Sequence, residues 1–146
     1  MQTIETRLID RTGWPKGPWD LEPDKVQWQD EATGLPCLIV RAHSGAWCGY
    51  VGVPNGHPAF KSRYQDVGVD VHGCLTYSDS CDPDGNICHD VEEGEDDNVW
   101  WLGFDCAHSG DLAPAYDFTR RGTYRGIDYV RDEVASLAGQ LAEQGP

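Results

Sequence analysis

Two short segments combine acidic and histidine side chains at spacings that suit metal or acid–base chemistry. The first is DVHG at residues 70–73, and the second is DCAHSGD at residues 105–111. Imidazole and carboxylate groups together bind divalent metals through mixed nitrogen and oxygen ligands. An aspartate that orients a histidine supports proton transfer, and the same groups can hydrogen-bond a ribose or a base. If the protein is an enzyme, the predicted catalytic residues are His72, Asp105, His108 and Asp111.

A purely structural role is the alternative for these residues. Asp and Gly that follow a strand commonly form the next turn, and a histidine at a strand end often only satisfies local hydrogen bonds. The residue types favour the functional interpretation, but the spacing alone is compatible with both.

The elements that must position these groups are expected to be strands. Residues 99–107 begin with an unbroken apolar run, which is typical of a central strand. Residues 67–73 alternate valine with Gly, Asp and His, which is the period of a strand. On a strand, Asp70 and His72 point to the same face. Pairing of the two strands would then bring two histidines and several aspartates together.

The six cysteines include a group with the residue types of a zinc site. Cys81 and Cys88 are separated by six residues, His89 follows at once, and Cys106 lies on the strand predicted over 99–107. Three Cys and one His are a standard tetrahedral zinc set. A disulfide between Cys81 and Cys88, or free buried thiols, are the alternatives. The candidates for the fourth zinc ligand are His72, His89 and Cys74.

The remaining patterns predict one α+β domain, in which an antiparallel or mixed sheet carries a C-terminal helix on one face. The chain of 146 residues has the length of a single domain. Residues 36–41 and 47–53 are expected to form a hairpin. The other expectations are an irregular Trp/Pro arm over 1–20, a short helix over 22–30, a Cys-rich acidic excursion over 78–98 and an amphipathic helix over 124–143.

Charge and hydropathy narrow the classes of partner. The formal net charge is −14, and no basic stripe is visible, which argues against binding to a nucleic-acid polymer. No apolar run approaches the ~18 residues of a membrane span, and residues 1–7 lack the features of a signal peptide. We therefore expect a cytosolic protein without a membrane partner. In a reducing cytosol, clustered cysteines favour metal binding over disulfides.

Four stretches of the chain resemble a known family. They are DVHGCLTY (70–77), CDPDGNICH (81–89), VWWLGFDCAHSGD (99–111) and the terminal helix YVRDEVASLAGQLAEQ (129–144). Over roughly residues 45–144, the chain is similar to short, largely uncharacterised proteins of tailed bacteriophages, notably those of actinobacteria, and of some bacterial genomes. The family has Gly where this chain has Cys74. The resemblance therefore implies Cys81, Cys88, Cys106 and a histidine, of which His89 is the nearest, as zinc ligands.

The first function hypothesis is a phage accessory protein, made in the host cytosol, that sequesters a small nucleotide-derived defence signal. The resemblance implies the phage context. The Trp and Tyr content suits base stacking, and the cluster Arg120, Arg121 and Arg125 suits a phosphate. Homo-oligomerisation is left open. The predicted ligand-binding residues are Asp70, His72, Tyr77, Trp101, Asp105, His108, Asp111 and Arg120.

Two further hypotheses belong to other classes. A metal-dependent hydrolase would use Asp70 and the residues predicted to be catalytic to hold a metal that activates water, although no HExxH motif or P-loop is present. A protein-binding inhibitor would dock its acidic surface, including residues 92–97, on a basic host enzyme.

Overall fold

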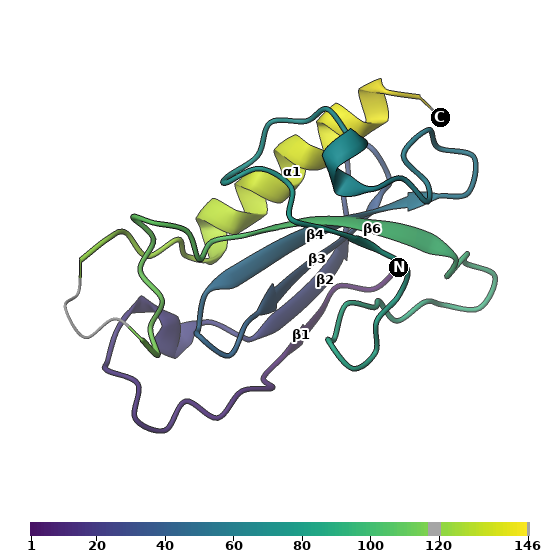
Figure 1. The fold of residues 1–146 in the computed structure, drawn as a ribbon. Coiled ribbons are helices and arrows are strands. Elements are labelled where there is room, and N and C mark those ends of the chain that lie inside the picture. Colours follow the sequence, from purple (N-terminus) through teal and green to yellow (C-terminus); the bar gives the residue numbers. More distant parts are fainter. Residues whose placement is uncertain (117–120, 146) are drawn as a thin grey trace.

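A six-stranded antiparallel sheet covered on one face by a single long helix forms the body of the protein (Figure 1). The computed structural model describes residues 1–116 and 121–145. The strand order is β1-β2-β3-β4-β6-β5, and α1 packs across β3 and β4. The predicted α+β class is confirmed. The elements are β1 (Ile4–Thr6), β2 (Lys25–Gln29), β3 (Pro36–Arg41), β4 (Trp47–Pro54), β5 (Tyr77–Asp79), β6 (Val99–Asp105), α1 (Ile127–Glu143) and two 3₁₀ turns (Pro18–Leu21 and Tyr64–Asp66).

The strands alternate between two apolar cores, one on each face of the sheet. In β3, Cys37 and Ile39 face the core beneath α1, whereas Leu38 and Val40 face the opposite side. The second core also contains Ile87, which comes from the excursion between β5 and β6. Both faces of β3, β4 and β6 are therefore buried, which explains their nearly continuous apolar sequences.

The helix α1 closes the first core with an apolar stripe. Its side chains Val130, Val134, Leu137, Ala138 and Leu141 are buried. The helix approaches β4 closely at Gly49, where a Cβ atom would lie 2.6 Å from Val134 and from Phe104. Only glycine leaves room for both side chains there.

A buried ionic network ties the arm, the sheet and the start of α1 together. The Arg41 guanidinium is fully buried and donates to Asp24 Oδ1 at 3.0 Å and to Glu22 Oε1 at 3.2 Å. Glu22 also accepts the Tyr124 hydroxyl and the N–H of Ile127 at the start of α1, the latter at 3.0 Å. Glu22 thereby takes the place of a side-chain helix cap, which Gly126 lacks.

Asp24 makes stability depend on pH in the acid range. Burial would raise the pKa of its carboxyl group, but N–H groups of Ile9 and Leu8 and the Arg11 guanidinium donate to it and hold the pKa below 3.8. Because the folded-state pKa lies below the unfolded one, the carboxylate stabilises the fold above pH ~4, and this contribution is lost as the pH falls through the folded pKa.

Asp24→Asn is accordingly expected to lower the free energy of unfolding at pH 7 by about 1–3 kcal/mol. The difference from the parent protein should shrink as the pH falls below about 4. Urea unfolding at pH 7, 5, 4 and 3 measures this, with the exposed Asp84→Asn as control. A difference that stays constant over this range would contradict the assignment.

The prediction of a helix over residues 22–30 is wrong, because this segment contains the strand β2. The sequence KVQWQ alternates, so that Val26 and Trp28 pack into the core beneath α1. On the other face, Lys25 Nζ donates to the carbonyl of Cys88 at 2.8 Å, and Gln27 Nε2 donates to that of Asp90 at 3.1 Å. Pro23 precedes a strand rather than starting a helix.

The strand predicted over residues 67–73 is also wrong, because this segment is irregular. Its valines do pack toward α1, as the alternation suggested. However, the helix supplies the hydrogen bonds that a neighbouring strand would have made. Gln140 accepts from the N–H of Asp70 at 2.7 Å and donates to its carbonyl at 2.8 Å.

Short regular elements interrupt the arm and the excursion. The arm over residues 1–20 contains β1 and most of the first 3₁₀ turn, where Trp19 is buried against Tyr124. The excursion over 78–98 starts within β5 and holds an isolated bridge between Asp82 and Ile87. No helix in the described part of the chain is long and apolar enough to span a membrane.

Candidate functional site

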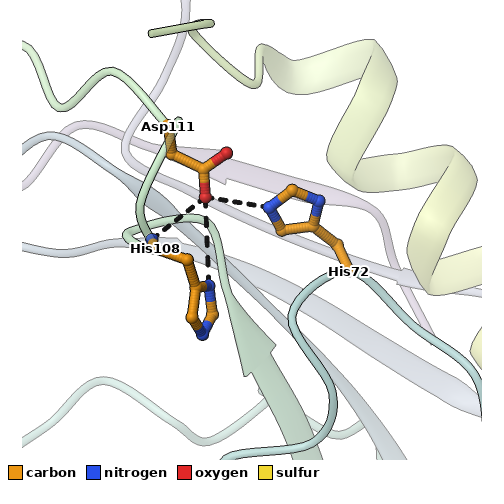
Figure 2. Close-up of side chains that lie close together, drawn as sticks. All are labelled: His72, His108 and Asp111. Atoms are coloured by element: carbon orange, nitrogen blue, oxygen red, sulfur yellow. Dashed lines mark hydrogen bonds and ion pairs between the residues drawn. The ribbon is translucent and has the colours of Figure 1, made fainter.

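His72, His108 and Asp111 come together beside the start of α1 (Figure 2). One ligand atom from each lies within 4.8 Å of the other two. His72 belongs to the irregular segment before β5, whereas His108 and Asp111 belong to the turn after β6. Three of the four predicted catalytic residues thus form one cluster.

Asp111 is the centre of this cluster. Its side chain is only 2% exposed, and Oδ2 lies 2.8 Å from His72 Nε2 and accepts the backbone N–H of His108 at 3.0 Å. Its other oxygen accepts Arg125 Nε at 3.1 Å. Burial would raise the pKa of this carboxyl group, but the hydrogen bonds from His72, the His108 N–H and Arg125 outweigh it and lower the pKa. These contacts therefore favour the ionised form of the Asp111 carboxyl group.

His72 is held from the side of α1. Its Nδ1 lies 2.8 Å from the Tyr129 hydroxyl, and its backbone N–H donates to Glu133 Oε1 at 2.8 Å. The imidazole also packs edge-on against the Tyr129 ring, with centroids 5.4 Å apart. These contacts fix the ring so that Nε2 points at Asp111.

His108 is the more accessible histidine of the cluster, with 36% of its side chain exposed. Its Nδ1 lies 3.9 Å from Asp111 Oδ2 and 3.4 Å from Asp105 Oδ1, yet it has no hydrogen-bond partner among the described residues. The ring packs directly over Gly73, where a Cβ atom would lie 2.3 Å from it. Gly73 also has a φ of +67°, so glycine is needed there for two reasons.

Asp105, the fourth predicted catalytic residue, borders the cluster through His108. Its carboxylate accepts the Thr76 hydroxyl at 3.1 Å and the N–H of Ala107 at 3.1 Å. The side chain is 32% exposed. Asp105 therefore lies at the solvent side of the cluster.

The helix α1 contributes two side chains that the sequence did not assign to the site, Tyr129 and Glu133, and Arg125, which was predicted to meet a phosphate, lies just before the helix. Arg125 hydrogen-bonds to Asp111, its guanidinium lies 4.9 Å from the Tyr129 ring centre, and Tyr129 and Glu133 hold His72. A signal was present for the two helical residues, because Tyr129 and Glu133 are four positions apart and so share one face of α1. The predicted ligand residue Arg120 lies outside the described residues.

Three predicted ligand-binding residues do not join the cluster. Trp101 is fully buried on the opposite face of the sheet, and Tyr77 packs there against Tyr50, with ring centroids 5.4 Å apart. Their positions follow from the alternation of β6, which turns Trp101 away from α1 and Leu102 toward it. Asp70 is exposed and contacts Gln140 through its backbone.

The predicted zinc ligands Cys81, Cys88, His89 and Cys106 are not brought together, which corrects that expectation. Cys81 and Cys88 form a disulfide across the Asp82–Ile87 bridge, while His89 packs against Trp101. Cys106 is a free thiol in the core beneath α1. The sheet therefore separates Cys106 from the other three residues.

The pairing of the cysteines predicts how many thiols react. Protein denatured in the lysate in the presence of an alkylating agent, without reductant, is expected to keep one disulfide and to carry four alkylated cysteines per chain. Intact-mass spectrometry counts the alkyl groups, and the double variant Cys81→Ser/Cys88→Ser should give the same count. Six alkylated cysteines in the parent protein would contradict the disulfide.

Comparison with known proteins adds no assignment: no family model, no curated protein and no solved structure matches this chain.

Proposed function

We propose that the protein binds a divalent transition metal, with zinc as the first candidate, through His72 Nε2, His108 Nδ1 and Asp111 Oδ2. The observation that carries this proposal is that one ligand atom from each of the three residues lies within 4.8 Å of the other two. Zinc bonds to nitrogen and oxygen of about 2.0–2.1 Å in a tetrahedron place ligand atoms about 3.3–3.4 Å apart. The separations of 2.8 and 3.9 Å from Asp111 Oδ2 bracket this value.

The surrounding hydrogen bonds support the same proposal. Metal-binding histidines commonly engage their second ring nitrogen in a hydrogen bond, and metal-binding carboxylates are likewise held by outer donors. His72 uses Nδ1 on the Tyr129 hydroxyl, and Asp111 uses its other oxygen on Arg125. In each of these two residues, the atom that is not proposed to bind the metal therefore has a hydrogen-bond partner that orients the side chain.

The chemistry that fits such a site best is hydrolysis. Three protein ligands would leave a coordination position for water, as in catalytic zinc sites, and a metal held there would supply a water that is nucleophilic near neutral pH. Asp105 is partly exposed beside His108. We assign it the role of general base, because its carboxylate lies 3.4 Å from His108 Nδ1 and is accessible to solvent.

Hydrolysis of chromogenic esters tests this proposal. Zinc-loaded protein, protein stripped by a chelator and reloaded protein are compared on p-nitrophenyl acetate and p-nitrophenyl phosphate. We expect activity that follows the metal, and a drop in kcat of about 100-fold or more in Asp105→Asn with zinc retained. The control is Asp70→Asn, an exposed aspartate outside the cluster. Activity unaffected by metal removal would exclude the proposed mechanism.

The sequence hypotheses of a phage accessory protein, of a sequestered nucleotide signal, of an acidic inhibitor and of a cytosolic location stay predictions. A sequestering protein would release an intact ligand on denaturation, whereas a hydrolase would convert it. Mass spectrometry of small molecules released from the purified protein separates these two functions.

A further inference from the structure

We infer that the substrate carries an oxyanion, a phosphate or a carboxylate, next to the bond that is cleaved, and that Arg125 recognises it. This inference rests on the proposed metal site and adds the chemical class of its substrate. Arg125 is a cation in a strongly acidic protein, whose sequence has 25 Asp and Glu but 11 Lys and Arg.

Arg125 has hydrogen-bond donors beside Asp111 that no described residue accepts. Its Nε donates to Asp111 at 3.1 Å, and the part of the chain that the structure describes offers no acceptor to its two terminal nitrogens. The side chain is 30% exposed. A guanidinium has donors arranged as a fork that matches the oxygens of a phosphate or a carboxylate.

The guanidinium is also held in place before any ligand arrives. It lies 4.9 Å from the Tyr129 ring centre and bonds to the same carboxylate that would hold the metal. Little rotamer entropy remains to be lost when an anion binds. An oxyanion has several oxygens, so one can coordinate the metal while another accepts from Arg125.

The net negative charge of the protein bears on whether an anion can bind beside Arg125. A net charge of −14 repels anions at long range, so an anionic substrate needs local positive charge to bind. The metal and Arg125 would supply it together. If Arg125 served only to orient Asp111, its terminal nitrogens would contribute nothing to ligand affinity.

Calorimetry with inorganic phosphate as the probe tests the inference on zinc-saturated protein. We expect phosphate to bind the parent protein and to bind Arg125→Gln about 10- to 100-fold more weakly. Arg131→Gln is the matched control, since Arg131 lies over the Trp28 ring away from the cluster. Arg125→Lys, which keeps the charge but not the fork, should be intermediate and decides the matter if Arg125→Gln fails to hold zinc.

The outcomes separate the two proposals. Zinc binding without phosphate binding, or equal phosphate affinity in the parent and Arg125→Gln, would overturn the inference and leave the metal site standing. Failure of the parent protein to bind zinc would remove the metal site itself, and the inference with it.

Discussion

Asp111→Asn is expected to weaken zinc binding by more than about 100-fold. Loss of an outer hydrogen bond to a ligand typically costs 10- to 100-fold in metal affinity, and the loss of a ligand costs more. Asparagine keeps the shape of aspartate and an oxygen acceptor, but it removes the negative charge and adds donors. Isothermal titration with zinc in a weakly coordinating buffer measures the change.

The control for this prediction is Asp70→Asn, which should bind zinc as the parent protein does. Asp70 was also predicted from the sequence as a site residue, yet it is exposed and contacts α1 only through its backbone. Equal losses in both variants would mean that zinc binds to the acidic surface in general. Unchanged affinity in Asp111→Asn would remove Asp111 from the site.

Arg41→Leu is expected to lower the free energy of unfolding by about 3–5 kcal/mol, because it leaves buried carboxylates without their cationic partner. Arg41 is fully buried and bridges Asp24 and Glu22, and its guanidinium lies 4.2 Å from the Trp47 ring centre. Leucine can fill part of the space, but it cannot neutralise the two acids. Urea unfolding at pH 7 measures the loss.

Two further variants distinguish the effect of unpaired buried charge on stability from the effect of lost packing. Arg63→Leu, which removes an exposed ion pair with Asp66, should cost less than about 1 kcal/mol. The double variant Arg41→Leu/Asp24→Asn should be more stable than the sum of the single losses predicts, because it leaves one carboxylate fewer without a partner. Strict additivity would indicate that packing alone explains the effect.

The main elements of the fold could be predicted because their own side chains are buried. The apolar runs of β3, β4 and β6 and the stripe of α1 report local burial directly. The segments over 22–30 and 67–73 were predicted wrongly because distant partners decide them. Carbonyls of the excursion bind one face of β2, and Gln140 replaces a neighbouring strand at Asp70.

The candidate site, like the fold, could be predicted from the sequence in part. The residue types of His72, His108 and Asp111 pointed to a shared site, but the predicted pairing of two strands is not what joins them. Tyr129 and Glu133 of α1 bring His72 to Asp111 instead. The sequence spacing of Cys81, Cys88 and Cys106 gave no information on which face of the sheet each occupies, and this separates Cys106 from the disulfide.

Anomalous diffraction at the zinc edge, from crystals of the zinc-loaded protein, tests the metal site most directly. The account predicts one strong peak bonded to His72 Nε2, His108 Nδ1 and Asp111 Oδ2, with Arg125 and Tyr129 still bound to the ligands. A peak at cysteine sulfurs or at His89, or zinc found only on the exposed acids of residues 92–97, would contradict it.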